Sequence, residues 1–359
     1  MFQKIGIVRF RNKMACCSIV SILFLGMQAQ MVIAQTSSPQ PKLPIDWFQR
    51  ASDQMSLRMP SSSPFHMMVV FHAYPGVELL NKKESPHILF GDGVYEETWL
   101  APHTWRREVT FGDYRAVEVD GDGGRKMQSS SDYEPSRVLM LLSALLDPLP
   151  RELVSRVYML DGVSDWKISL EKKQSIPLVH ITKNDGNPRS KATYDFYFQP
   201  DGLLLWRSEM NLISKWENSV DFGGKVVSKH LSILAGERTL VDANVTIDAM
   251  GQVDPTIFQL PIKPADSWLR MRPFHEFEIK GHTLTFLRRF VIFPDFPPVG
   301  GFILWSVLDR RGRYREVELI EGTNLPEAKY AMASMRKLWA EPFSIDGKPC
   351  EMKVNWDMY

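Results

Sequence analysis

Cysteine is scarce in this sequence of 359 residues, and the scarcity excludes several kinds of protein. Two of the three cysteines, Cys16 and Cys17, lie in an apolar run near the N-terminus, which leaves Cys350 alone in the rest of the chain. A single cysteine forms neither an internal disulfide bond nor a cysteine-based metal site. We therefore expect a fold that depends on a hydrophobic core, which a chain of this length can supply.

The sequence also lacks a bias toward either sign of charge. Its 43 lysines and arginines nearly balance 42 aspartates and glutamates, so the formal net charge is +1. Four of the basic residues precede residue 14, where there is no acidic residue, and the remainder carries 39 basic and 42 acidic residues. Nucleic-acid binding needs a basic surface, so this composition predicts no nucleic-acid partner.

Catalytic and cofactor-binding motifs are absent as well. The sequence contains no HExxH, no GxSxG and no phosphate-binding GxxxxGK[ST] motif. We therefore expect no catalytic residues, no cofactor and no metal ligands, and we predict that the protein is not an enzyme. A hydrolase without a recognisable motif is a further alternative, because catalytic groups meet in space and not in sequence.

Two patterns resemble metal sites, but each has a simpler structural explanation. His66 and His72 lie six residues apart on one expected strand, without a third ligand nearby in the sequence. Residues 120–125 begin like a calcium-binding loop, yet Gly124 stands at a ligand position and Arg125 at the position of the turn glycine. We expect a core or surface strand in the first case and a hairpin turn in the second.

Four charged residues are expected to lie on two neighbouring strands, where they would form a charged cluster or a solvated sheet face. A solvated face is the commoner arrangement, and ion pairs there contribute little to stability. We therefore expect these side chains to be exposed. They are Glu96, Glu97, Arg106 and Arg107.

The first 34 residues have the pattern of a secretory signal peptide. A basic segment from Lys4 to Lys13 precedes the apolar stretch 14–27, and residues 32–34 (Val-Ile-Ala) suit cleavage by signal peptidase. We therefore expect residues 1–34 to be a signal peptide and the protein to be periplasmic. The alternative is an uncleaved inner-membrane anchor over 14–34, which is long enough to span a membrane although glutamines interrupt it.

Residues 44–262 are expected to form a strand-rich domain after a flexible lead-in at 35–43. From Phe65 onward, apolar segments alternate with turns rich in Gly, Asp and Pro, which predicts antiparallel strands. One helix is expected over 135–147, where nearly every residue is apolar. Such a helix must be buried on most sides, and it is too short to span a membrane. The proline-rich segment 263–300 is expected to be a linker or to add strands.

The last sixty residues show a specific order of elements. An apolar strand over 302–308 and a second strand over 313–320 precede an amphipathic helix. Trp339, an Asp-Gly-Lys-Pro turn at 346–349 and an alternating final strand follow. This order resembles the C-terminal domain of the TonB energy-transducing proteins. The resemblance implies a small ββαβ domain over 301–359.

Two core residues and one binding edge are expected in this domain. Trp339 and Leu319 are predicted to be buried. The strand 350–356 is predicted to be a sheet edge to which an extended peptide adds through main-chain hydrogen bonds. The candidate site residues are Glu351, Lys353, Val354, Asn355 and Trp356. The expected partner is a protein or peptide of the cell envelope, such as an outer-membrane transporter.

The larger domain resembles, in architecture, the half-barrel of LolA-like periplasmic lipoprotein carriers and sigma-factor regulators. The resemblance rests on the strand-rich order, the strands around Trp99 and Trp105, the apolar helix and a hairpin at Gly202. It implies a curved antiparallel sheet whose concave face binds a lipid or a peptide. The alternative is that helix 135–147 simply fills the concavity.

Together these patterns predict an α+β protein. An N-terminal curved antiparallel β half-barrel with a buried helix precedes the small C-terminal ββαβ TonB-like domain, with the split between 262 and 300. The predicted function is protein or peptide binding by a non-enzymatic envelope protein, in TonB-linked transport or envelope assembly. A periplasmic lipid or lipoprotein carrier or sensor is the alternative, with a possible lipid as ligand.

Overall fold

A computed structural model provides the structure, which describes residues 43–359 with internal gaps. The gaps are 77, 80–89, 123, 132–133, 147, 150–165, 184–192, 210–211, 261–283, 286–301, 323–324, 343, 346–347, 350–351 and 359. The predicted signal peptide and nearly all of the lead-in lie outside the described residues. Pro39–Tyr359 forms one compact unit.

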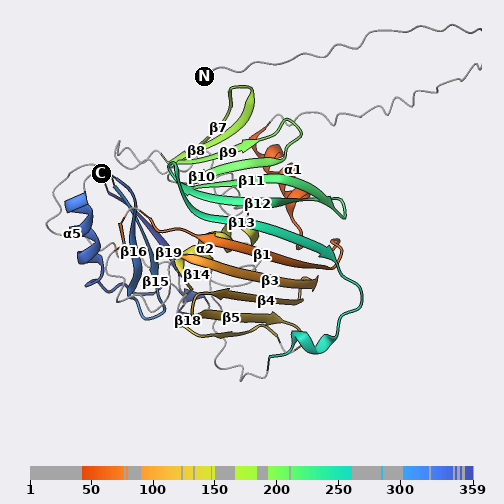
Figure 1. The fold of residues 1–359 in the computed structure, drawn as a ribbon. Coiled ribbons are helices and arrows are strands. Elements are labelled where there is room, and N and C mark those ends of the chain that lie inside the picture. The colour runs from red at the N-terminus through yellow and green to blue at the C-terminus, as the bar shows by residue number, and fades with distance from the viewer. Residues whose placement is uncertain are drawn as a thin grey trace, which may run out of the picture. The chain divides into compact units, whose positions relative to one another are not determined.

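Twelve antiparallel strands form one large sheet (Figure 1) in the order β6-β5-β4-β3-β1-β13-β12-β11-β10-β9-β8-β7. The strands are β1 (Phe65–Ala73), β3 (Gly91–Ala101), β4 (Thr104–Phe111), β5 (Tyr114–Asp120), β6 (Lys126–Ser129), β7 (Trp166–Lys173), β8 (Ile176–Lys183), β9 (Thr193–Phe198), β10 (Leu204–Glu209), β11 (Leu212–Phe222), β12 (Lys225–Ala235) and β13 (Arg238–Ala249). A 3-10 helix, η1 (Pro255–Phe258), follows β13. The expected large antiparallel sheet with few helices is thus confirmed.

One face of this sheet, called the inner face here, carries most of the core. Successive side chains of a strand point to opposite faces, and in β1 every second residue, including Val69 and Phe71, is buried. The inner face continues across the neighbouring strands, because Val69 is opposite Tyr95 of β3 and Val245 of β13. Leu231 of β12, opposite Ala243, extends it further.

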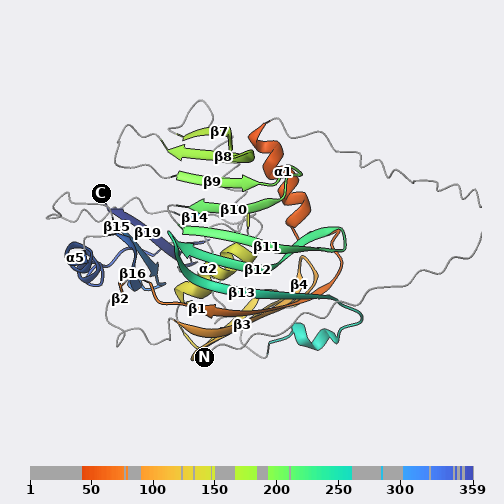
Figure 2. The ribbon, with the colours of Figure 1, turned by 45° about the horizontal axis from the view of Figure 1, so that its top comes forward.

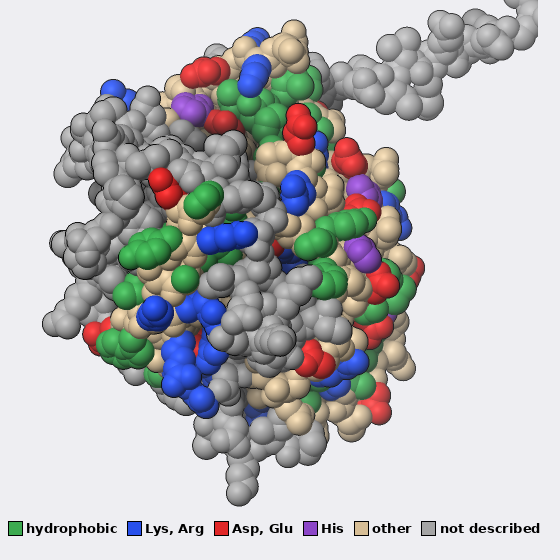
Figure 3. Space-filling model, turned by 60° about the vertical axis from the view of Figure 1, so that its left-hand side comes forward, with side chains coloured by type: hydrophobic (Ala, Val, Ile, Leu, Met, Phe, Trp, Pro, Cys, Tyr) green, Lys and Arg blue, Asp and Glu red, His purple; other side chains and the backbone are tan. Residues whose placement is uncertain are grey.

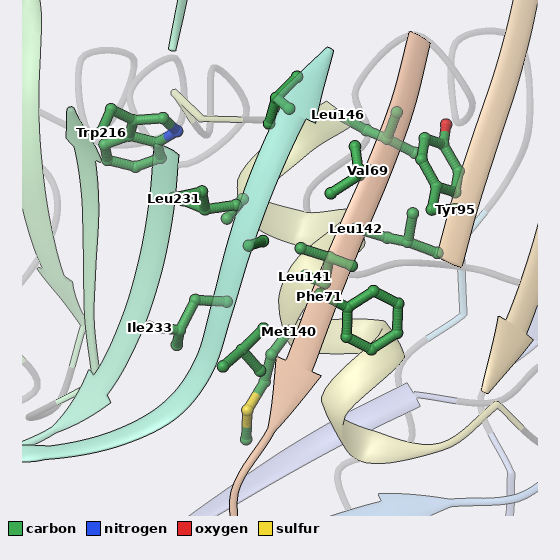
Figure 4. Close-up of a cluster of buried hydrophobic side chains, with 14 of the residues drawn as sticks. Val69, Phe71, Tyr95, Met140, Leu141, Leu142, Leu146, Trp216, Leu231 and Ile233 are labelled. Carbon is green, nitrogen blue, oxygen red and sulfur yellow. The ribbon is translucent and has the colours of Figure 1, made fainter. Parts of the chain in front are cut away.

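Helix α2 (Ser136–Leu146) covers the centre of the inner face. It is the apolar helix expected over 135–147, and all but one of its residues are buried. In Figure 4, Met140, Leu141, Leu142 and Leu146 lie among inner-face side chains of β1, β3, β12 and β13. The helix is apolar on every side because both its sheet-facing and its far side are covered.

A second helix, α1 (Pro44–Met55), covers another part of the inner face. Its Pro44 occupies the first turn, where the missing N–H costs nothing. Phe48 contacts Phe196 and Phe198 of β9 edge-on, with ring centroids 4.8 and 5.7 Å apart. Figure 2 shows the two helices at separate positions along the sheet.

The C-terminal residues form a second sheet, called the C-terminal sheet here, in the order β19-β15-β16-β2. Its elements are β2 (Glu78–Leu79), β15 (Phe302–Leu308), β16 (Tyr314–Gly322), α5 (Leu325–Met335) and β19 (Met352–Met358). Helix α5 packs on β15 and β16 through Ala328, Met332 and Met335. Three two-residue strands, β14 (Leu284–Thr285), β17 (Ser344–Ile345) and β18 (Lys348–Pro349), form a small separate sheet.

The two expected core residues of this region differ in outcome. Leu319 is fully buried, as predicted. Trp339 is 62% exposed, so its prediction as a core residue is wrong. The helix ends at Met335, before the apolar stripe reaches Trp339. The indole instead lies against the β15–β16 turn, where its Nε1 donates a hydrogen bond to the Arg311 carbonyl at 2.8 Å.

Contacts join the C-terminal sheet to the rest of the compact unit. Strand β2, which comes from the region assigned to the first domain, pairs with β16 at Glu318 and Leu319. Trp305 of β15 is fully buried in the core of the large sheet, and Val307 packs against Leu139 of α2. The domain split between 262 and 300 stays a prediction, since most of that segment lies outside the described residues.

Candidate functional site

The inner face and α2 together form the candidate site. Beneath α2 the face consists of Val69, Phe71, Tyr95, Leu231 and Ile233 (Figure 4), all with less than 2% exposure. This is an apolar surface of the kind that accepts an acyl chain, but here the side chains of α2 fill it. Of the two arrangements expected for the concave face, open or filled, the structure has the filled one around α2.

Two arginines hold the C-terminal end of α2. Arg58 donates a hydrogen bond to the Leu145 carbonyl at 3.4 Å. Arg207 donates to the Pro148 carbonyl at 3.0 Å and to the Ser143 hydroxyl at 3.2 Å. The last carbonyls of a helix have no partner within the helix and carry partial negative charge. Both guanidinium groups therefore stabilise this end of α2.

Arg58 also belongs to a buried charged cluster on the inner face. Glu97 has no exposed surface; it accepts hydrogen bonds from Arg58 at 2.8 Å, Arg107 at 3.1 Å and the Tyr95 hydroxyl at 3.0 Å. Burial alone would raise the pKa of Glu97, but the charges and hydrogen bonds of the two arginines lower it to about 2. Glu97 is therefore ionised at neutral pH.

The expectation that these charged residues form a solvated face is wrong for two of them. Glu97 pairs in register with Met67 and Arg107, which places all three on the inner face. Arg107 lies over the Trp105 ring, 4.1 Å from its centroid, so a cation–π contact supplements its ion pair. The strand alternation puts Glu96 and Arg106 on the opposite face, where both are half-buried.

The N-terminal end of α2 is held by the C-terminal sheet through a buried ion pair. Arg137 of α2 donates two hydrogen bonds to the Glu318 carboxylate of β16, at 2.7 and 2.6 Å. Arg137 also donates to the Tyr74 carbonyl, and the Gly76 N–H donates to Glu318 at 2.7 Å. Arg137 is 1% exposed and Glu318 is 3% exposed, so the ion pair is desolvated. Removing one partner of such a pair strongly destabilises the fold, because the charge of the other partner stays buried.

Glu316, two residues before Glu318, caps the same helix end. Its Oε2 accepts a hydrogen bond from the Ser136 N–H at 2.5 Å, which satisfies a donor that the helix leaves free. Its Oε1 has no hydrogen-bond partner among the residues that the structure describes. The backbone of Glu316 has a φ of 49°, in the left-handed region, where the register of β15 and β16 shifts. This irregularity directs the Glu316 carboxylate toward α2.

Burial dominates the protonation of Glu316. It raises the pKa to about 7, and the Glu318 charge adds to the effect. The Ser136 hydrogen bonds and the Arg137 charge act in the opposite direction without offsetting burial. Glu316 is therefore partly protonated near neutral pH.

The polar anchors of α2 are pairings within the chain. Arg58 and Arg207 engage its C-terminal end, and Glu316 and Glu318 engage its N-terminal end. Within the described ranges, no three His, Cys, Asp or Glu side chains are arranged to hold a metal ion. The same residues include no helix that is long and apolar enough to cross a membrane.

The two sequence patterns that resemble metal sites, the histidines of β1 and the segment 120–125, lie in different parts of the large sheet. His72 lies on β1 with its Nδ1 2.7 Å from Asp92 of β3. The calcium-like segment 120–125 connects β5 to β6, and Gly124 there has a φ of 70°. The positive φ agrees with the expected turn, because glycine adopts it without steric cost.

The predicted peptide-binding strand is at one end of the C-terminal sheet. Among the described strands, β19 pairs with β15, with Lys353 opposite Val307 and Asn355 opposite Trp305. Val354 and Trp356 are opposite Ser306 and Leu304. Glu351 lies outside the described residues. Peptide binding by these residues stays a prediction.

Sequence reasoning missed the residues that anchor α2. Arg137 is the only charged residue within an apolar helix, which is a usable signal for a buried ion pair. Glu316 and Glu318 alternate with Val317 and Leu319 in β16, which predicts that both glutamates lie on one face and is a second signal. Nothing in the sequence pairs these groups with one another, because 181 positions separate Arg137 from Glu318.

Comparisons with known proteins add little. No family model matches the chain, and no curated protein matches it either. Among solved structures it is similar to the crystal structure of a LolA superfamily protein from Nitrosomonas europaea. The match covers 61% of this chain and 99% of that chain, with 8% identity and a TM-score of 0.32. A likeness this low carries no argument about family or function, and the TonB resemblance stays a prediction.

The raised pKa of Glu316 predicts a specific pH dependence of stability. Between about pH 4.5 and about pH 7 the folded chain binds more protons at this group than the unfolded chain. The free energy of unfolding should therefore fall by roughly 3 kcal/mol as the pH rises through this window, and stay level above it. Glu316→Gln should remove this fall, as measured by urea unfolding at several pH values.

Glu237→Gln, an exposed residue of the turn between β12 and β13, is the matched control for this experiment. It should leave the fall in the free energy of unfolding between about pH 4.5 and about pH 7 as large as in the wild-type chain. Identical pH profiles for the wild-type chain and Glu316→Gln would contradict the assignment.

Proposed function

We propose that the protein is a non-enzymatic, periplasmic carrier or sensor of acyl chains. The ligand is a lipid or lipoprotein whose chain binds the inner face in place of α2. One observation carries the proposal: the apolar centre of the inner face is covered by a short helix whose polar anchors are confined to its two ends. Export by the N-terminal 34 residues is part of the same proposal.

When an acyl chain replaces α2, the apolar contacts that the ligand gains offset the apolar contacts that the helix loses. The middle of α2 contributes only apolar contacts, which an acyl chain can replace at about 0.8 kcal/mol per buried CH₂ group. The cost lies at the anchors, where the helix loses hydrogen bonds to Arg58 and Arg207 or to Glu316 and Glu318. Opening at one end alone leaves the other anchor in place, so half of this cost is avoided.

The anchors therefore set the apparent affinity for a ligand. A ligand that binds only the open state has its affinity reduced by the fraction of molecules in that state. Weakening an anchor should raise the open fraction and tighten binding. If α2 can be displaced, removing a polar anchor that does not touch the ligand should strengthen ligand binding. If α2 is a permanent part of the core, the same change should not strengthen binding.

The test is Arg207→Met, which removes the hydrogen bonds to Pro148 and Ser143 but keeps most of the apolar stem. Losing these two hydrogen bonds to a charged group should favour opening by about 1.5–3 kcal/mol and tighten binding about tenfold or more. The measurement is titration with a fluorescent long-chain fatty acid, with near-ultraviolet circular dichroism to verify folding.

Arg115→Met is the matched control, because Arg115 is exposed and, among the described residues, its guanidinium donates to the nearby carbonyls of Gly112 and Tyr114. It should leave the affinity unchanged. No binding by either the wild-type chain or the folded Arg207→Met variant would contradict the proposal and leave α2 as a permanent part of the core.

A second candidate function is capture of an extended peptide by β19. The observation that favours it is the position of β19 at the end of the C-terminal sheet. An end strand leaves every second main-chain N–H and C=O without a partner strand, and a peptide can pair with them. The partner would be a protein of the cell envelope, with TonB-linked transport as one such setting.

Amide hydrogen exchange of the isolated protein tests this second candidate. Amides of 352–358 that face β15 should exchange slowly, and the alternate amides should exchange fast. Slow exchange at every amide of the strand would mean that both edges are already paired, and peptide addition would then be excluded.

A further inference from the structure

Two aromatic side chains near the end of α5 are unusually exposed. Tyr330 is 59% exposed and Trp339 is 62% exposed. Trp339 is nevertheless held in place, because its Nε1 donates to the Arg311 carbonyl and the following residue, Ala340, donates its N–H to Gly312 at 3.0 Å. The chain thus fixes a large indole at the surface.

Basic residues belong to the two segments that hold this indole. They come from the β15–β16 turn, which an isolated bridge between Arg313 and Trp339 places beside the indole, and from the end of α5. The basic residues are Arg310, Arg311, Arg313, Arg336 and Lys337. We call them, with Trp339, the Trp339 patch. Figure 3 shows lysine and arginine side chains gathered beside hydrophobic ones on this side of the molecule.

Among the described residues, no carboxylate pairs with Arg313 or Lys337 of the patch. Asp309 is buried, and its carboxylate is engaged by Arg315 at 2.9 Å and by the N–H groups of Arg311 and Arg313. Glu341 is the nearest exposed acid in the sequence. Arg313 and Lys337 therefore place two positive charges without a described carboxylate partner beside Trp339.

Local stability explains only part of this arrangement. Arg336 and Lys337 follow the end of α5, where cations interact favourably with the helix dipole. That effect does not account for the arginines of the turn or for an exposed tryptophan. An indole with one apolar face and one polar N–H, flanked by arginine and lysine, has the chemistry of the membrane–water interface.

We propose that the Trp339 patch docks the protein on an anionic lipid surface. The indole lies at the level of the headgroups, and Arg313 and Lys337 contact lipid phosphates. A turn that carries a single exposed indole suits a flat surface, whereas a nucleic-acid strand would be expected to follow a groove lined by several aromatic residues. The inference does not depend on the proposed function, since it uses no residue of the inner face or of α2.

The test is co-sedimentation of the full chain with vesicles. Phosphatidylcholine vesicles with and without phosphatidylglycerol distinguish charge-driven docking from apolar adsorption. Each basic residue near an anionic surface strengthens binding about fivefold, so the double variant Arg313→Glu/Lys337→Glu should bind at least about 25-fold more weakly. Trp339→Ala should also weaken binding, with its far-ultraviolet circular dichroism unchanged.

The matched control is Lys167→Glu/Lys172→Glu, two exposed residues of β7 with the same change in net charge. It should bind anionic vesicles as tightly as the wild-type chain. Equal loss in both double variants would overturn the proposal, because bulk charge and not the patch would then drive binding. Equal binding to both vesicle types, or tighter binding to a single-stranded oligonucleotide than to anionic vesicles, would also overturn it.

Discussion

The buried ion pair between Arg137 and Glu318 is the constraint on which the rest of the structure depends. Neither charge reaches water, so each must find its partner for the chain to fold. Their meeting places the N-terminal end of α2 against β16 of the C-terminal sheet. Arg137 also donates to the Tyr74 carbonyl, and Glu318 accepts from the Gly76 N–H, so the same two side chains hold the segment between β1 and β2. Helix, loop and sheet are therefore fixed by one interaction.

This constraint makes α2 the element that the two sheets share. The large sheet supplies the apolar surface beneath the helix and the arginines at its C-terminal end, and the C-terminal sheet supplies the carboxylates at its N-terminal end. The position of such a helix is fixed at its ends by charged groups and in its middle only by apolar contacts. A ligand that reproduces the apolar contact therefore competes with the middle of α2 without needing to match any polar group, which is the physical basis for the proposed carrier function.

Much of the fold could be predicted from the sequence, because alternation and apolar runs are local signals. The strands of the large sheet, the helix at 135–147 and the burial of Leu319 follow from periodicity. Trp339 could not be placed, because the helix stops before its apolar stripe does and the indole packs on a turn. The burial of Glu97 depends on Arg58 and Arg107 reaching it from other elements. The anchors of α2 likewise arise from long-range pairing, which one sequence does not reveal.

The central claim is that α2 opens from the sheets without unfolding of the whole chain. Native-state hydrogen exchange measures this directly, because it reports a separate opening free energy for each protected amide. The account predicts that the amides of 139–146 open at lower free energy than those of β1 and β13, and that Glu318→Gln lowers the opening free energy of α2 further. Exchange of α2 only through global unfolding, at the same free energy as β1 and β13 in both chains, would contradict it.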